Sequence, residues 1–298
     1  MKKLLFLYNL HAGKGQARMK LPGILDALTQ AGYLVTAYPT QGPGDAVQMA
    51  QRYGARYDRL VCCGGDGTLH EVVNGLMALP PEKRPVVGYL PAGTTNDFAR
   101  NLDLPRGLEN MARVAAAGCP RPCDVGRFQK DYFIYVAAFG LFSDVAYSTP
   151  QQSKNVLGHL AYVLKGVTEL SSLKGYHLRV EHDKGVLEDD FVYGMFSNTV
   201  SVGGVIGLPK SEVALDDGLL EAVLVRMPKN PIEFQAAVRA LVQQEYNESG
   251  GVMGLHSSKF TVTCEEPVPF TLDGEFGGEH TGVMIDDSPR AFTIVYGK

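Results

Sequence analysis

The feature that most constrains the fold is a regular alternation of strand-like and helix-like segments in the first half of the chain. Short β-rich apolar runs follow one another every 26 to 30 residues, about the length of one strand plus one helix. The runs are Leu4–Tyr8, Leu34–Tyr38, Leu60–Cys63 and Val86–Leu90. Between them apolar residues recur with helical spacing, as in Leu69, Val72, Val73 and Leu76. This βαβα series predicts an α/β domain with a parallel sheet covered on both faces.

The second half has a different pattern. After about Val125, longer runs of alternating residues predict a mainly antiparallel β-sandwich. The expected strands are Tyr132–Ala138, Leu187–Phe196, Leu219–Val225, Phe260–Thr263 and Phe292–Val295. Helices are expected at Leu157–Leu170 and Ile232–Tyr246. We therefore expect two domains, 1–125 and 126–290, with a last strand near 290–298 that returns to the first domain and an active cleft between them.

Composition excludes several classes of protein. The 298 residues are 45% hydrophobic and 20% charged, which is typical of an ordinary globular chain. A net charge of −4 argues against a nucleic-acid binder, because such domains are usually basic. Lys2 and Lys3 before an apolar run resemble a signal peptide, but the run is short and favours a buried strand. Five cysteines without a CxxC pair predict free thiols, and neither a zinc site nor a disulfide framework, although Cys119 and Cys123 could form a disulfide bridge.

Glycine is in excess, with 34 residues where an average usage of about 7% gives roughly 21. Several glycines follow the predicted strands, where ligands of parallel sheets bind. The first such loop is Tyr8-Asn9-Leu10-His11-Ala12-Gly13-Lys14-Gly15. Gly13 and Gly15 would let backbone N–H groups approach an anion, although glycines here can also serve the turn alone.

The second loop is Gly64-Gly65-Asp66-Gly67-Thr68-Leu69-His70-Glu71, where the third strand gives way to a helix. It matches neither a P-loop nor GxGxxG, but glycines before a helix N-terminus suit a polyphosphate. A carboxylate beside a phosphate requires a metal ion or a transferable proton, so Asp66 is informative. Alternatively, Asp66 is a simple N-cap, Glu71 completes the first helical turn and His70 is a surface or packing residue.

The third loop is Pro91-Ala92-Gly93-Thr94-Thr95-Asn96-Asp97-Phe98-Ala99-Arg100. The hydroxyls of Thr94 and Thr95 could bond phosphate or ribose oxygens. Asn96 and Asp97 could fix the loop or reach a metal-bound water. One of these residues is explained by a helix cap, but a cap does not require all four.

Together these motifs resemble the bacterial diacylglycerol kinase catalytic-domain family, soluble lipid kinases related to sphingosine kinases. The resemblance rests on Gly-Gly-Asp-Gly-Thr and, about 25 residues later, Pro-Ala-Gly-Thr-Thr-Asn-Asp-Phe-Ala-Arg. It continues through Cys123-Asp124-Val125-Gly126, Leu215-Asp216-Asp217-Gly218-Leu219 and Leu272-Asp273-Gly274-Glu275. NAD kinases share the first motif and the fold, whereas the later motifs favour the lipid kinases. The resemblance implies a nucleotide-binding domain at 1–125 and a lipid-substrate domain at 126–290.

The resemblance also implies ATP and Mg²⁺ as cofactors and assigns residues to them. The ATP-binding residues would be Asn9, Leu10, His11, Ala12, Gly13, Thr40, Gly65, Asp66, Gly67, Thr68, Leu69, His70, Glu71 and Thr94. A structural Mg²⁺ would be held by Asp217 and the carbonyls of Ala214 and Leu219. Asp66, Asp97 and Asp124 would form an acidic network that links this ion to the cleft. Many bacterial members carry Asn where this chain has His70, and sphingosine kinases carry His there.

Phosphoryl transfer to a hydroxyl requires a group that accepts the alcohol proton. Glu275 resembles the family's proton acceptor, and Asp66 is the rival base. We favour Glu275 as the base and Asp66 as the organiser of Mg²⁺ and ATP. The alternative for Asp273-Gly274 is a plain hairpin turn.

The family's acceptor is a membrane lipid, and diacylglycerol is the expected substrate. Sphingoid bases, other lipids and NAD are alternative acceptors, and a non-catalytic nucleotide-binding module is an alternative function. We expect a cytoplasmic protein, peripheral to the membrane, that docks transiently on the membrane surface and binds no nucleic acid. A homodimer is an assembly to test. Lys154, His159, Lys165 and Lys174 bracket the expected helix at Leu157–Leu170 and could dock on lipid, or the helix could pack on its own domain.

Overall fold

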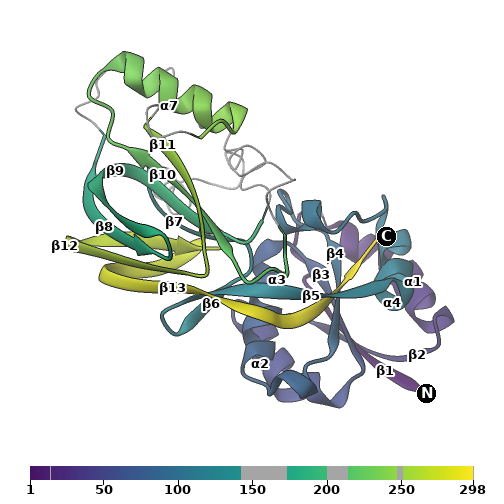
Figure 1. Ribbon diagram of the computed structural model, residues 1–298. Helices are drawn as coiled ribbons and strands as arrows, with labels where there is room; N and C mark the ends of the chain where they lie inside the picture. Colours follow the sequence, from purple (N-terminus) through teal and green to yellow (C-terminus); the bar gives the residue numbers. More distant parts are fainter. Residues whose placement is uncertain (14, 142–172, 200–213, 247–250, 298) are drawn as a thin grey trace. The chain divides into compact units, whose positions relative to one another are not determined.

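The computed structural model describes residues 1–297 except 14, 142–172, 200–213 and 247–250 (Figure 1). The chain divides into two compact units, which we call the α/β unit and the β unit. The α/β unit comprises Met1–Asp124 and Arg290–Lys298, and the β unit comprises Val125–Pro289. The expected helix at Leu157–Leu170, with Lys154, His159 and Lys165 beside it, lies outside the described residues.

Strands of the α/β unit pair in parallel. They are β1 (Lys2–Tyr8), β2 (Tyr33–Pro39), β3 (Arg59–Gly64) and β4 (Val86–Pro91), and β5 (Cys119–Phe128) begins in this unit. β1 pairs with β2 and β3, and β3 pairs with β4. Ile294, near the end of the chain, pairs in parallel with Val87 of β4. Each of the four strands expected from the apolar runs lies within an observed strand.

Helices cover both faces of this sheet. They are α1 (Gln16–Gln30), α2 (Asp45–Tyr53), α3 (Asp66–Met77) and α4 (Leu108–Ala117), with short 3₁₀ helices η1 (Gly54–Arg56), η2 (Pro81–Lys83) and η3 (Phe98–Asn101). Val61 and Cys63 of β3 pack in one core with α1 and α4. Successive strand residues point to opposite faces, so Leu60 and Cys62, which are equally buried, face the side of α3.

Strands of the β unit pair antiparallel. Those described are β6 (Asp131–Phe133), β7 (Val136–Gly140), β8 (Tyr176–His182), β9 (Gly185–Ser197), β10 (Leu220–Arg226), β11 (Val252–Ser257), β12 (Lys259–Leu272) and β13 (Glu275–Tyr296). Their order is β11-β10-β9-β7-β12-β13, and β8 pairs with both β9 and β12. The hydrophobic core of this unit includes the aromatic residues Phe139, Phe196, Phe260 and Phe270.

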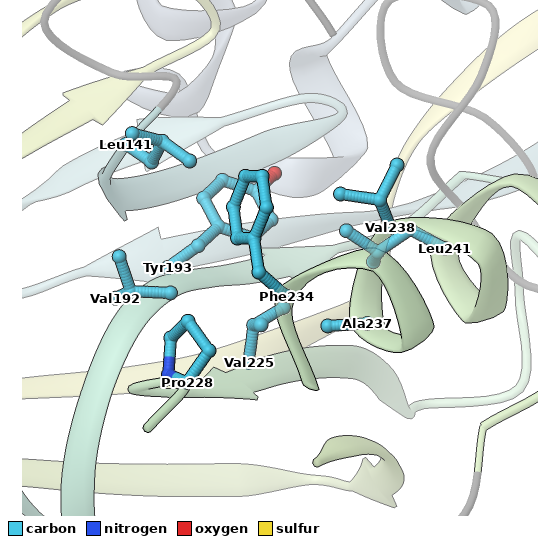
Figure 2. Close-up of a pocket in the computed structure, with 9 residues that line it drawn as sticks. All are labelled: Leu141, Val192, Tyr193, Val225, Pro228, Phe234, Ala237, Val238 and Leu241. Carbon is cyan, nitrogen blue, oxygen red and sulfur yellow. The ribbon is translucent and has the colours of Figure 1, made fainter. Parts of the chain in front are cut away.

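One helix of the β unit, α7 (Pro231–Gln243), packs on β9 and β10 over an apolar hollow (Figure 2). Its N-terminus is capped by Asn230, whose Oδ1 accepts the N–H groups of Ile232 and Glu233. The hollow is lined by Leu141, Val192, Tyr193, Val225, Pro228, Phe234, Ala237, Val238 and Leu241. Burial of Tyr193 beneath the helix raises the pKa of its phenol.

Two sequence predictions in the β unit are wrong in detail. The expected strand Tyr132–Ala138 is two strands, because the N–H groups of Ile134 and Tyr135 bond to the carboxylate of Asp273 and not to a neighbouring strand. The helix expected to reach Tyr246 ends at Gln243, because Gln244 takes a left-handed conformation with φ of 56°.

No helix in the described part of the chain is long and apolar enough to cross a bilayer. None of the five cysteines, all of which are described, forms a disulfide bond, so Cys119 and Cys123 are not bridged. Burial raises the pKa of the Cys63 thiol to about 12, which keeps it protonated and unreactive.

Arg84 holds the returning end of the chain to the α/β unit. Its guanidinium donates to Leu79 O (3.0 Å) and Met77 O (3.2 Å), at the C-terminal end of α3, and also to Ala291 O. Carbonyls at a helix end lack intrahelical donors, so one side chain satisfies two carbonyls there and joins them to a third in β13.

We predict that Arg84→Met lowers the free energy of unfolding by about 2–3 kcal/mol, because it removes charge-assisted hydrogen bonds from half-buried carbonyls. Arg113→Met is the matched control, since Arg113 is exposed and bonds Asn110 on its own helix, and should change stability by less than about 0.5 kcal/mol. Urea unfolding followed by circular dichroism measures both. Equal losses in the two variants would contradict the role of Arg84.

Candidate active site

Three strand-to-helix loops of the α/β unit meet backbone to backbone. Asn9 N donates to Cys63 O (2.9 Å), and Ala92 N donates to Gly64 O (2.8 Å). A Cβ atom at Gly13 would lie 2.3 Å from Ala92 O, and one at Gly93 would lie 2.6 Å from the Cα of Gly65. Such distances exclude any side chain, so these glycines permit the close approach of the loops after β1, β3 and β4. Gly13 also has a left-handed φ of +56°.

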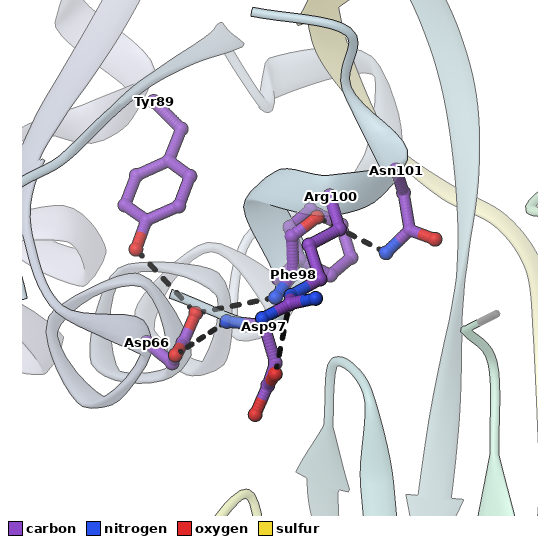
Figure 3. Close-up of polar contacts among 6 residues, drawn as sticks. All are labelled: Asp66, Tyr89, Asp97, Phe98, Arg100 and Asn101. Atoms are coloured by element: carbon purple, nitrogen blue, oxygen red, sulfur yellow. Dashed lines mark hydrogen bonds and ion pairs between the residues drawn. The ribbon is translucent and has the colours of Figure 1, made fainter. Parts of the chain in front are cut away.

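Asp66 connects two of these loops (Figure 3). It is the first residue of α3, and its Oδ2 accepts the N–H of Asp97 (2.9 Å). Its Oδ1 accepts the N–H of Phe98 (3.3 Å) and the hydroxyl of Tyr89 (3.5 Å). The carboxylate therefore caps the N-terminal end of η3 from another loop. One interpretation of the sequence had Asp66 as the N-cap of α3, but Gly65 is the N-cap of that helix, and the Asp66 carboxylate instead accepts N–H groups at the start of η3.

The third loop is held by its own side chains. Asn96 takes a left-handed φ of 53°, and its amide accepts from Gly93 N and donates to Gly93 O, both at 2.9 Å. Asp97 is 5% exposed, and its Oδ1 lies 3.6 Å from Nε of the half-exposed Arg100. Asn96 thus fixes the loop, as one reading of the sequence expected. The carboxylates of Asp66 and Asp97 belong to the same loop pair, with Arg100 supplying positive charge.

Glu71 has a role that the sequence did not reveal. Its two carboxylate oxygens accept the N–H groups of Gly44 (2.8 Å) and Ala46 (3.1 Å), at the N-terminus of α2. It therefore caps a different helix and fixes the loop that follows β2. Thr40 begins that loop and donates its N–H to Tyr8 O (3.0 Å). The ring of His70 lies beside the amide of Asn74, one turn along α3, with 3.3 Å between the nitrogens.

The residues expected to bind ATP all lie in the α/β unit, either in the loops after its strands or, from Asp66 to Glu71, in the first turns of α3. The first loop is shaped by Asn9, whose Oδ1 accepts the N–H of His11 (2.8 Å). Thr94 is exposed in the third loop, whereas Thr68 and Leu69 are buried in α3. The side chains of Thr68 and Leu69 are thus packed in the protein interior. At these two positions only backbone groups could contact a ligand.

Glu275 lies in the β unit at the end of a two-residue turn. Asp273 and Gly274 both have positive φ, 51° and 86°, and Leu272 pairs with Glu275 across them. These values fit a type I′ hairpin turn, so the plain-turn interpretation of Asp273-Gly274 is correct as geometry. The side chain of Asp273 does more, because it accepts the N–H groups of Ile134, Tyr135 and Val136. Glu275 itself is exposed.

The proposed magnesium residues lie in an exposed turn before β10. Oδ1 of Asp217 accepts the N–H of Leu219 (3.0 Å), and Gly218 has a φ of 77°. Among the described residues, no three or more His, Cys, Asp or Glu side chains are arranged to hold a metal ion. A site here would depend on backbone carbonyls, as proposed for Ala214 and Leu219, and hard oxygen ligands of this kind suit Mg²⁺.

Asp124 is fully buried at the end of the first segment of the α/β unit. Its Oδ1 accepts the N–H of Arg290 at 2.5 Å, where the second segment of that unit begins. The carboxylate therefore holds two distant parts of the chain together. Asp124 therefore has a structural role in the α/β unit, and its membership of an acidic network stays a prediction.

Comparison with known proteins identifies both units. A family model described as the diacylglycerol kinase catalytic domain matches residues 3–128. A second, described as the YegS C-terminal NAD kinase beta sandwich-like domain, matches residues 136–296. A diacylglycerol kinase of Bacillus subtilis (strain 168) is 33% identical over 288 residues, which cover 96% of this chain and 94% of the relative. One of Staphylococcus aureus (strain bovine RF122 / ET3-1) is 33% identical over 93% of this chain and 87% of the relative.

Solved structures agree with these relatives. A crystal structure described as a diacylglycerol kinase from Bacillus anthracis str. Sterne has a TM-score of 0.78 at 25% identity, covering 99% of this chain and 97% of that one. Another structure from the same strain has a TM-score of 0.84 at 26% identity, covering 99% and 95%. The two-domain architecture, with a C-terminal β-sandwich-like domain, is therefore shared.

We predict that Gly93→Ala weakens the binding of ATP by at least about tenfold, because the new Cβ would force the third loop away from Gly65. Gly282→Ala is the control, since a Cβ there meets only a Thr263 methyl group at 4.0 Å. Isothermal titration calorimetry measures the affinity and circular dichroism checks the fold. Wild-type affinity in a folded Gly93→Ala protein would show that the loop contact is not needed for the nucleotide.

Proposed function

This chain belongs to the diacylglycerol kinase catalytic-domain family, and on that premise we propose that it transfers the γ-phosphoryl group of ATP to the hydroxyl of diacylglycerol, giving phosphatidic acid. The α/β unit would bind the nucleotide, and the β unit would supply the proton acceptor. The two curated relatives described above are both named diacylglycerol kinase, which favours this lipid over a sphingoid base, another lipid or NAD.

The observation that carries the proposal is the contact among the three glycine loops. Glycine at positions 13, 65 and 93 lets the backbones of these loops approach one another where side chains would otherwise stand. The N-terminus of α3 begins at the same place, with Asp66 as its first residue. Backbone N–H groups at a helix N-terminus attract phosphate oxygens, so this arrangement suits the β- and γ-phosphates of ATP.

Mg²⁺ is proposed as the cofactor because carboxylates stand beside this phosphate position. Asp66 and Asp97 would repel a polyphosphate without a cation between them, and Mg²⁺ when bound neutralises charge on the phosphates. Asp66 would also keep the third loop in place through its bonds to Asp97 N and Phe98 N. Asp217, with the carbonyls of Ala214 and Leu219, would hold a structural Mg²⁺, linked to the active site by the proposed network of Asp66, Asp97 and Asp124.

Glu275 is the proposed general base. The lipid hydroxyl must lose its proton as its oxygen bonds to the γ-phosphorus, while the bond to the β-phosphate oxygen breaks and ADP leaves. An exposed carboxylate on a fixed turn has lone pairs available for that proton. Asp66 is less suited, because protonation would weaken its bonds to Asp97 N, Phe98 N and Tyr89 Oη.

The acceptor lipid lies in a membrane, so the proposal includes transient docking of a cytoplasmic enzyme on the membrane surface. A homodimer is also proposed as an assembly to test. Vesicle co-sedimentation with and without anionic lipid measures the docking, and equal failure to bind both kinds of vesicle would remove it. Size-exclusion chromatography with light scattering measures the assembly.

We predict that Glu275→Gln lowers kcat by about 10²–10⁴-fold, because it removes the proton acceptor while keeping the size of the side chain. Asp66→Asn should also lose most activity, through misplaced ATP. Glu279→Gln is the matched control, because Glu279 lies on the same strand and is also exposed, and it should keep wild-type turnover.

The assay is transfer of label from γ-labelled ATP to diacylglycerol in mixed micelles. A panel of phosphatidylglycerol, sphingoid base, ceramide and a polyprenol tests the acceptor, and NAD without lipid tests the rival kinase. Full turnover in Glu275→Gln would remove that residue as the base. Labelling of NAD and of no lipid would replace the proposed function.

A further inference from the structure

A buried carboxylate lies two residues before the proposed base. Asp273 is 5% exposed, and its side chain accepts three consecutive backbone N–H groups. Oδ2 bonds to Ile134 N at 2.7 Å, and Oδ1 bonds to Tyr135 N at 2.9 Å and Val136 N at 3.0 Å. Asp273 N in turn donates to Val136 O at 2.8 Å. Charge-assisted bonds of this kind offset the cost of burying the carboxylate.

The turn itself does not require this carboxylate. A type I′ hairpin turn needs positive φ at two residues, and Asn followed by Gly meets that need as well as Asp followed by Gly. The backbone of Asp273 and Gly274 would therefore close the turn with an amide at position 273. The carboxylate instead binds the connection between β6 and β7, and it interrupts those strands to do so.

The hairpin ladder beside this turn is irregular. β12 and β13 change register between Phe270 and Thr271, so that Leu272 pairs with Glu275 and Thr271 with Phe276, but Phe270 pairs with Gly278. A bulge disrupts the ladder and lets the strand bend locally. The ladder to β13 is thus irregular just before the tip that carries Glu275, and beyond the pairs that Thr271 and Leu272 form with β7 the tip needs a further anchor. The bonds of Asp273 to residues 134–136 supply one.

We propose that Asp273 is the positioning residue for Glu275, a role that rests on the proposed function of Glu275 as the base. A general base must lie within hydrogen-bond reach of the proton it takes, and a misplacement of about 1 Å can cost about 10²-fold in rate. Asp273 fixes the tip against the β6–β7 connection, and only Gly274 separates it from Glu275.

Asp273→Asn tests this role. The amide keeps the size of the side chain and one acceptor oxygen, but it turns an NH₂ group toward a backbone N–H. We expect kcat to fall by about 10–100-fold with the KM for ATP changed by less than about threefold, and with a folded protein by circular dichroism. Asp273→Glu keeps the charge but displaces the tip by a methylene, so it should also lower kcat with little change in the KM for ATP. This variant replaces Asp273→Asn in the test if the Asn variant does not fold.

A double-mutant cycle separates positioning from a merely structural effect. If Asp273 acts through Glu275, then Asp273→Asn combined with Glu275→Gln should have the kcat of Glu275→Gln alone. Losses that multiply would overturn the inference. Asp183→Asn is the matched control, because Asp183 is exposed at the β8–β9 turn, accepts the N–H of Ser258 (2.7 Å) and should leave kcat unchanged.

The two proposals fail in different ways. A folded Asp273→Asn or Asp273→Glu variant with wild-type kcat would overturn the positioning role and leave the lipid kinase proposal intact. A wild-type enzyme that labels no lipid in the panel would overturn the lipid kinase proposal, and with it the role of Asp273 toward Glu275. The expected result is a wild-type enzyme that labels diacylglycerol, a selective loss of kcat in the single variants and no further loss in the double variant.

Discussion

Close backbone contact among the loops after β1, β3 and β4 is the constraint on which the rest of the α/β unit depends. Ala92 O stands where a side chain of residue 13 would be, and Gly65 Cα where a side chain of residue 93 would be. The loops can meet only because the parallel strands end at one edge of the sheet. Once they meet, Asp66 can reach Asp97 N and Phe98 N in the next loop. Glycine at positions 13 and 93 is therefore what allows the three loops to lie against one another at the N-terminus of α3.

Acidic side chains hold distant parts of this chain together by accepting backbone N–H groups. Glu71 caps α2, Asp66 caps η3, Asp124 bonds the returning strand and Asp273 bonds the β6–β7 connection. The partners are between 25 and 166 residues away. A carboxylate suits this use because it accepts several bonds at once and because N–H groups at helix starts carry partial positive charge. Several acidic residues in the motifs that resemble the kinase family therefore also stabilise the fold.

This use of carboxylates explains which features the sequence could predict. β1, β3 and β4 were predictable because each contains a continuous apolar run that is buried on both faces. β2 is an edge strand with mostly exposed or half-buried residues, and it was predictable from its β-rich composition and its regular spacing from the other runs. The end of α7 at Gln243 was not predictable, because local periodicity does not indicate that Gln244 takes a left-handed conformation. The break between β6 and β7 at Ile134 was not predictable either, because it depends on the carboxylate of Asp273, which lies 139 residues away in the sequence. Likewise the glycine motifs indicated a phosphate site, but the actual partners of Asp66 and Glu71 depend on tertiary contacts. The expected helix at Leu157–Leu170 lies outside the described residues.

The acidic residues thus fall into two physical classes, and the classes bear on their chemistry. Asp66 and Asp273 have both carboxylate oxygens bonded to protein donors, so a proton on either would compete with bonds that keep a loop or a turn in place. Glu275 and Asp217 are exposed, with room for a proton or a cation. A base must release and regain its proton in each turnover without disturbing the fold, and an exposed carboxylate on an anchored turn meets that requirement. The proposed roles of Asp273 as anchor and Glu275 as base are consistent with this difference in bonding, and they would apply to any hydroxyl acceptor.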